Sequence, residues 1–113
     1  MNLHIQDIWS PDLDPPSTGK PSDTSDFDIL AQVALGVAGQ AGREVFSVRV
    51  CSPSALARTA TGTFLANTLV LAQFEWAGLR ERLAKLLAQC DGCRDWEQVI
   101  QQLSGCLRYN DAV

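Results

Sequence analysis

Several patterns are missing from this 113-residue sequence, and each absence limits what the protein can do. The longest apolar run is far below the roughly 18 residues that a membrane-spanning helix needs. The first residues show no basic segment followed by an apolar one, so no secretory signal is recognised. We therefore expect a cytoplasmic protein without membrane contact, whose four cysteines stay as thiols and form no disulfide framework.

Basic residues are also scarce. Nine Lys and Arg stand against 13 Asp and Glu, and the net charge of −4 argues against direct binding to nucleic acid. Residues 1–30 hold six acids and one lysine, which is −5, whereas the remainder holds seven acids and eight bases, which is +1. An acidic segment of this kind either keeps a loop soluble or attracts a basic partner. The six acids are Asp7, Asp12, Asp14, Asp23, Asp26 and Asp28.

The length and the composition, 46% hydrophobic and 19% charged, are typical of a single globular domain over residues 1–113. Alternation of apolar and polar residues predicts strands over 3–9, 27–37, 43–51 and 68–74, the middle two joined by a glycine-rich hairpin loop. Between the first two strands lies "SPDLDPPSTGKPSDTSD". Loops longer than ~12–15 residues are uncommon in compact domains and are often functional.

The helices are predicted from caps and apolar stripes. Ser52 followed by Pro53 indicates an N-cap and the first residue of a short helix that ends near Arg58. Two amphipathic helices follow, the second capped by Asp95, with apolar stripes at Trp76, Leu79, Leu83, Leu86, Leu87 and Cys90, then at Trp96, Val99, Ile100, Leu103 and Leu107. We therefore predict an α+β fold, a small antiparallel β-sheet with two C-terminal amphipathic helices packed on one face.

The run "QCDGCRDW" places Cys90 and Cys93 two residues apart, with Cys106 further on. A structural zinc site needs four ligands, and the only other candidates, Cys51 and His4, lie on separate predicted strands. If the last helix runs to residue 107, Cys106 lies about eleven residues, or roughly 16 Å, from its start. A redox pair normally sits where a strand leads into a helix. We interpret the run as a joint between two helices and predict no metal.

Other catalytic patterns are weak. A nucleophile needs a base, and the only histidine, His4, is on a predicted strand, where a lone histidine is usually a surface residue. The pairs Asp12/Asp14 and Asp26/Asp28 are flanked by Pro and Ser, which favours a solvated loop or a partner contact over acid–base chemistry. "GVAGQAG" lacks the Lys-Ser/Thr of a phosphate-binding loop. We predict that the chain is not an enzyme and has no cofactor.

The three tryptophans differ in context. Trp76 and Trp96 each begin a helical stripe and are interpreted as core anchors. Trp9 adjoins the acidic loop, and both a core role and an interface role stay open for it, because exposed aromatic side chains often anchor interfaces. An acidic domain with a Pro-rich loop suits a protein that binds another protein.

Three patches resemble the bacterial immunity protein 8 family. "IWSPDLD" resembles its opening Ser-Pro-Asp element, and "DFDILAQVALGVAGQAGREVFSVRVCSPSALA" resembles its central hairpin and short helix. "QFEWAGLRERLAKLLAQCDGCRDWEQVIQQL" resembles its C-terminal strand and helix pair, with a Trp near each helix start and a Cys between them. The patches occur in the family's order and cover most of the chain.

The resemblance implies an immunity protein of a polymorphic toxin system, which acts in contact-dependent competition between bacteria. Such a protein binds the C-terminal domain of its cognate toxin and occludes the active site. Many of these toxins are nucleases with basic clefts, to which an acidic surface is complementary. Our hypothesis for the toxin-binding residues is the set Trp9, Asp12, Asp14, Asp23, Asp26 and Asp28.

Two other functions stay open from the sequence. One is a non-catalytic adaptor domain of the same α+β architecture that has no toxin partner. The other is an enzyme with unrecognised catalytic residues, which would need convergent polar groups around His4 or Cys51. An immunity protein would protect cells against one toxin domain and no other, whereas an adaptor would not.

Overall fold

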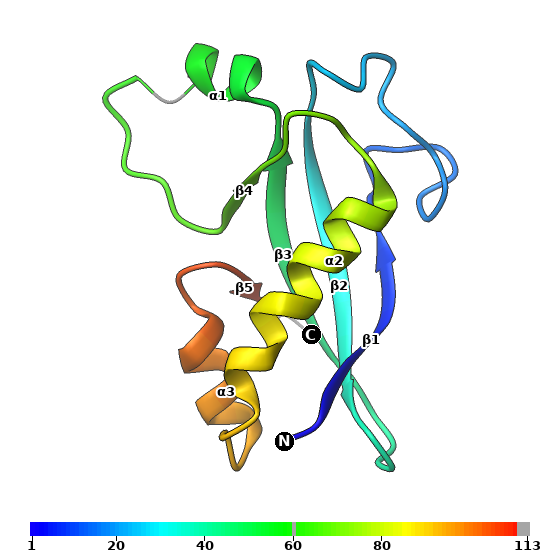
Figure 1. Ribbon diagram of the computed structural model, residues 1–113, viewed down its shortest axis with the longest axis vertical. Helices are drawn as coiled ribbons and strands as arrows, with labels where there is room; N and C mark the ends of the chain where they lie inside the picture. The colour runs from blue at the N-terminus through cyan, green and yellow to red at the C-terminus, as the bar shows by residue number, and fades with distance from the viewer. Residues whose placement is uncertain (60, 111–113) are drawn as a thin grey trace.

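The computed structural model describes residues 1–59 and 61–110, which form a sheet partly covered by helices (Figure 1). The strands are β1 (Leu3–Trp9), β2 (Asp28–Val37), β3 (Glu44–Cys51), β4 (Thr68–Val70) and β5 (Arg108–Tyr109). The helices are α1 (Pro53–Thr59), α2 (Trp76–Leu87) and α3 (Trp96–Leu103), and a 3₁₀ turn, η1 (Ala88–Cys90), follows α2. The strand order is β1-β2-β3-β4, and β5 also pairs with β3. The predicted α+β fold class is confirmed.

β2 lies between β1 and β3, and both pairings are antiparallel, as the alternation predicted. Val33 of β2 is opposite Ile8 of β1 on one side and Phe46 of β3 on the other. Gly39 and Gly42 adopt positive φ and close the β2–β3 hairpin, a conformation that glycine reaches without a Cβ clash. The predicted inner face is buried throughout, at Phe27, Ile29, Ala31, Val33, Leu35 and Val37.

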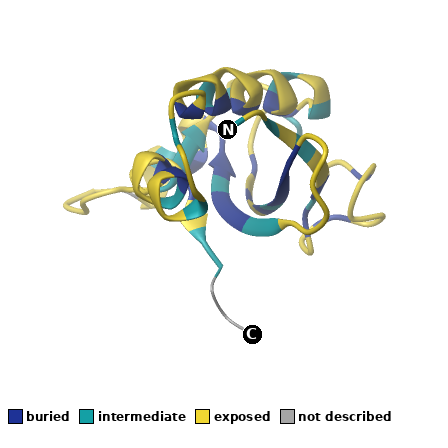
Figure 2. Ribbon diagram, turned by 90° about the horizontal axis from the view of Figure 1, so that it is seen from below, coloured by how far each residue is buried: buried dark blue, intermediate teal, exposed yellow. Residues whose placement is uncertain are grey.

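The C-terminal helices cover this inner face. α2 crosses the sheet, and its buried residues are Leu79, Leu83 and Leu87, each on the predicted stripe. Figure 2 shows buried residues on the side of the helices toward the sheet and exposed residues on the outer side. Burying one such leucine contributes roughly 1.5–3 kcal/mol relative to leaving it exposed, so the stripe is the main reason why α2 docks here.

β4 departs from the prediction in length and direction. The predicted strand over residues 68–74 ends at Val70, and β4 runs parallel to β3 rather than antiparallel. α1 follows the end of β3, and residues 61–67 then lead back along the sheet to the start of β4, a crossover of the length that a parallel pair requires. Beyond β4 the chain turns inward, and the buried Phe74 packs edge to face between Phe27 and Trp76, with ring centroids 5.5 and 5.3 Å away.

The last helix also ends earlier than predicted. α3 stops at Leu103, and Cys106 lies in the following turn. Leu107 is still buried, and its N–H donates to the carbonyl of Leu103 over 2.8 Å, so the apolar spacing fits one further turn. Pairing of β5 with β3, with Tyr109 opposite Phe46, then takes the chain into the sheet. This long-range pairing has no local signal in the sequence.

The long loop between β1 and β2 is held at several points. The indole Nε1 of Trp76 donates to the carbonyl of Gly19 over 2.8 Å, which ties the loop to the start of α2. Leu13 is buried in the core, and the N–H of Ser10 donates to the carbonyl of Pro16 over 2.9 Å. The predicted long loop is therefore present and is packed against the domain.

Ser52 joins three elements at one end of the sheet. It is fully buried, and its Oγ accepts from the N–H of Ala55 over 3.2 Å, which confirms it as the N-cap of α1. The same Oγ accepts from the N–H of Phe27 over 3.1 Å, just before β2. One hydroxyl thus connects the end of β3, the start of α1 and the start of β2.

We expect Ser52→Ala to lower the free energy of unfolding by about 1–2 kcal/mol, because it removes a helix cap and leaves buried N–H groups without an acceptor. Urea denaturation measures the change. Ser22→Ala, at an exposed loop position, is the control and should change the value by less than about 0.5 kcal/mol. Equal effects of the two variants would contradict the role assigned to Ser52.

Candidate functional site

The predicted acidic contact residues follow the β1–β2 loop into the start of β2, at the end of the sheet next to α1 (Figure 1). All of them are exposed to solvent. They differ in what their carboxylates bind, and this difference is not visible in the sequence. The residues are Asp12, Asp14, Asp23, Asp26 and Asp28.

Asp12 completes the edge of the sheet. Its Oδ2 accepts from the backbone N–H of Leu30 over 2.8 Å, and the hydroxyl of Ser10 donates to the carbonyl of Leu30 over 2.6 Å. β1 has ended at Trp9, so these two side chains satisfy the backbone of β2 on the edge where β1 no longer pairs with it. Asp12 therefore has a structural role in addition to its charge.

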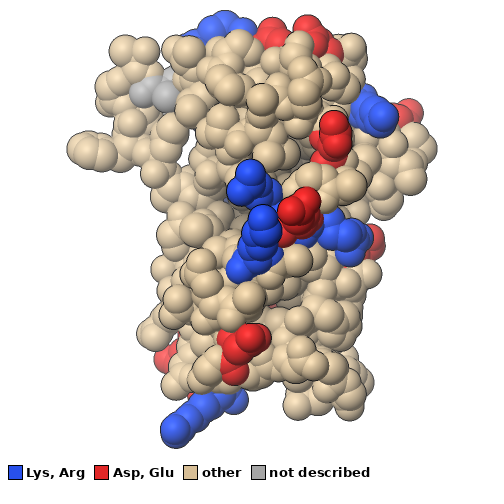
Figure 3. Space-filling model, viewed as in Figure 1, with Lys and Arg blue, Asp and Glu red and all other residues tan. Residues whose placement is uncertain are grey.

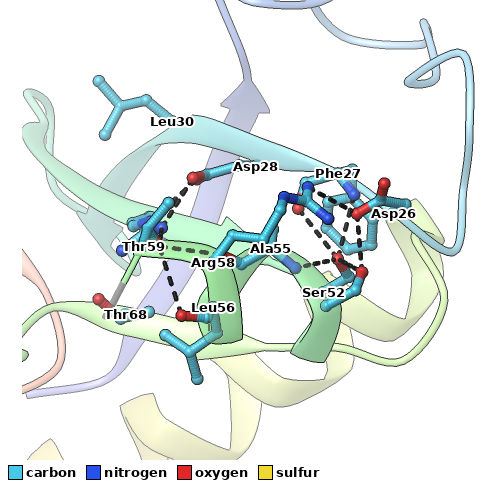
Figure 4. A network of polar contacts seen from close by, with 12 residues as sticks. Asp26, Phe27, Asp28, Leu30, Ser52, Ala55, Leu56, Arg58, Thr59 and Thr68 are labelled. Atoms are coloured by element: carbon cyan, nitrogen blue, oxygen red, sulfur yellow. Dashed lines mark hydrogen bonds and ion pairs between the residues drawn. The ribbon is translucent and has the colours of Figure 1, made fainter. Parts of the chain in front are cut away.

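Asp26 and Asp28 are each paired with an arginine (Figure 4). Asp26 Oδ1 accepts from Arg58 over 2.8 Å and from the hydroxyl of Ser54 over 2.7 Å. These hydrogen bonds, first from Arg58 and then from Ser54, lower the pKa of Asp26. Arg49 binds both oxygens of Asp28, over 2.9 and 2.7 Å, and the bond to Asp28 raises the pKa of Arg49.

These ion pairs orient charge more than they stabilise the fold. The side chains of Arg58 and Asp26 are 60% and 41% exposed, and exposed pairs typically contribute only about 0–1 kcal/mol. Arg49 also donates to the hydroxyl of Thr59 over 2.7 Å, so the second pair links β2, β3 and α1. The two arginines reduce the net negative charge that the sequence suggested for this end.

The remaining two acids keep their charge available. Asp23 accepts from the N–H and the hydroxyl of Ser25, over 2.9 and 2.8 Å, and these bonds lower its pKa. Asp14 forms no hydrogen bond or ion pair with the described residues. Asp12, Asp14 and Asp23 are therefore the acids of the set that no basic side chain in the described ranges neutralises, and of these Asp12 also accepts from the N–H of Leu30.

Trp9 is half-buried on the sheet face opposite the one that carries Ile8 and Val33. The guanidinium of Arg43, from the far end of the β2–β3 hairpin, lies 5.8 Å from the centroid of its ring, within cation–π range. Arg43, Arg49 and Arg58 are not among the contact residues predicted from the sequence. For Arg49 the predicted hairpin was a partial signal, because pairing of the two strands in the observed register makes Arg49 the diagonal neighbour of Asp28.

The cysteine run is the joint between α2 and α3. All four cysteines are free thiols, and burial raises the pKa of Cys90 to about 11. The Asp95 carboxylate accepts from the N–H of Gln98 over 2.9 Å, as the predicted cap requires. Cys106 lies in the turn after α3 rather than on the helix, so the predicted helix through Cys106 and the distance taken from it are wrong. Within residues 1–59 and 61–110, no group of three or more His, Cys, Asp and Glu side chains is placed to hold a metal ion.

In the same part of the chain, no helix has the length and apolar character needed to cross a membrane. The small α+β domain carries exposed charges and the exposed apolar side chains of Leu30, Phe64, Leu65 and Val70. The family model described as Immunity protein 8 matches residues 3–110, and the chain belongs to this family of immunity proteins. The predicted resemblance is confirmed. Comparisons with curated proteins and with solved structures found no match.

Separate replacement of Asp12 and Asp14 tests whether Asp12 stabilises the fold through its bond to Leu30 and Asp14 does not. We expect Asp12→Ala to lower the free energy of unfolding by about 1 kcal/mol, since the N–H of Leu30 loses its acceptor. Asp14→Ala removes the same charge without a bond and should stay within about 0.5 kcal/mol of the parent. Denaturation in urea gives both values, and a loss of the same size for Asp14→Ala would show that charge alone matters.

Proposed function

We propose that this protein neutralises a cognate toxin by binding the toxin's C-terminal domain and occluding its active site. The observation that carries the proposal is the family match over residues 3–110. The protein acts in the cytoplasm by stoichiometric binding in contact-dependent competition between bacteria. It performs no catalysis, uses no cofactor, and contacts neither nucleic acid nor the membrane itself.

We further propose that the toxin domain is a basic, nuclease-like protein and that the acidic end of the sheet binds it. The net charge of −4 and the position of the acids support this, because opposite surface charges raise association rates. Asp14 and Asp23 supply charge that no basic side chain in the described residues offsets. Asp26 and Asp28 are already oriented by arginines, so little side-chain entropy is lost when they meet a partner.

In the proposed contact, Asp12 positions the loop while its second carboxylate oxygen faces the toxin. Trp9 supplies an aromatic surface beside the acids, held by Arg43. Aromatic side chains in such positions often account for much of the binding energy of an interface. The proposed contact set is therefore Trp9, Asp12, Asp14, Asp23, Asp26 and Asp28.

Co-expression tests the function itself. We expect this chain to restore growth of cells that express its cognate toxin domain, and to leave cells unprotected against unrelated toxin domains. Colony counts with and without induction give the result. Failure to protect against any toxin domain, with the protein folded and expressed, would favour the adaptor interpretation instead.

Charge reversal tests the acidic contact. We expect the double variant Asp14→Lys, Asp23→Lys to slow association with the toxin domain by about tenfold or more at low salt. Stopped-flow or surface-binding kinetics measure the rate, and the difference should shrink as salt is added.

The matched control is Asp91→Lys, Glu97→Lys, two exposed acids near the start of α3 that change the net charge equally. If both double variants slow association alike, only the net charge of the protein matters. If neither slows it, the acidic loop is a solvated connector.

A further inference from the structure

A groove lies between α2 and the strands at the edge of the sheet. β4 and β5 both pair with β3 but at different residues, and Val48 of β3 falls between the two pairings. α2 forms the opposite wall. The resulting hollow has a volume of about 300 Å³, and its lining residues are Val48, Thr68, Leu69, Arg82, Leu83, Lys85, Leu86, Gln89, Cys106 and Leu107.

The lining of this groove has an apolar part and a basic part. The inner part is aliphatic, with contributions from β3, β4, α2 and the turn after α3. Both charged groups that line the groove, Arg82 and Lys85, come from the solvent-facing side of α2, and no carboxylate is among the lining residues. The groove therefore combines an apolar interior with a cationic margin in a protein whose net charge is negative.

The two cations are available to a partner. Arg82 forms no ion pair or hydrogen bond with residues 1–59 or 61–110. Lys85 is paired with Glu81 over 3.4 Å, but both side chains are about two-thirds exposed, at 67% and 68%, so the pair is weak and is easily exchanged. Figure 3 shows basic side chains over the middle of the face that carries α2, with acidic side chains beside them.

A second groove, on the other side of α2, has a different set of charged lining residues. It lies against β1 and is lined by Leu3, Ile5 and Ala84 among others, but it contains Arg80 together with Asp91. Because this lining contains both an acid and a base, it favours neither an anionic nor a cationic ligand. Of these two grooves, the one beside β4 and β5 has the lining charge that favours an anion.

We propose that this groove is a second docking site for the toxin and binds a segment in which an apolar side chain stands beside a carboxylate. The inference rests on the proposed function and adds a contact of opposite charge to the acidic end. The apolar group enters the aliphatic interior, and the carboxylate pairs with Arg82 and Lys85. Two sites of opposite charge on one protein fix the orientation of the partner, because a reversed partner places like charges together.

The test compares two double variants with the same change in net charge. We expect Arg82→Glu, Lys85→Glu to raise the Kd for the toxin domain by at least about tenfold, because repulsion replaces attraction at the groove. The control Arg80→Glu, Arg94→Glu alters exposed arginines outside the groove and should raise the Kd by less than about threefold. Equal effects of the two variants, or no effect of the first, would overturn the docking site. Protection against the toxin by the unmodified chain would still support the proposed function in that case.

A small probe tests the chemistry of the groove without the toxin. Sodium octanoate should shift the backbone NMR signals of Thr68, Leu86 and Leu107, octylammonium should not, and the groove variant should lose the response. Equal responses to the two probes would show that Arg82 and Lys85 select nothing, which overturns the inference. If octanoate binds but toxin affinity is unchanged in the groove variant, the site serves a free carboxylate ligand and the docking proposal fails.

Discussion

The apolar inner face of β2 is the constraint on which the rest of the structure depends. β2 pairs on both sides, and its inward side chains, from Ile29 to Leu35, are buried under α2. A shift of one residue in its pairing would turn this whole set toward solvent, so burial fixes the register of the sheet. That register places Asp28 diagonally from Arg49 and brings the start of β2 to the end of β3.

The two proposed binding surfaces follow from how the ends and the edge of this sheet are closed. The hydroxyl of Ser52 joins β2, β3 and α1, and the Asp26–Arg58 and Asp28–Arg49 pairs lie around it. At the other edge, β4 and β5 are too short to cover β3 fully, which leaves the groove beside α2. The charge at one end of the sheet and the apolar hollow along its β4–β5 edge are consequences of strand length and register rather than of composition.

Sequence reasoning succeeded where the signal is local. The alternation in β2 and β3, the Ser52 cap, the Asp95 cap and the stripe of α2 all lie within a few residues of one another, and the structure confirms each. It failed where partners are distant in the chain. The parallel pairing of β4, the β5 strand and the arginine partners of the acids depend on contacts across many residues. The composition gives the number of acids, but it does not show which of them form ion pairs with arginines.

The bond from Asp12 to Leu30 separates two kinds of position within one loop. Immunity proteins must follow changes in their toxins, and the loop between β1 and β2 is a natural place for such variation. Substitution of Asp12 or Ser10 removes a hydrogen bond to the exposed edge of β2. Asp14 forms no such bond with the described residues. If the loop binds the toxin as proposed, a lineage that acquires a new toxin is expected to change Asp14 and to keep Ser10 and Asp12, so that the contact surface changes while the edge of β2 stays closed.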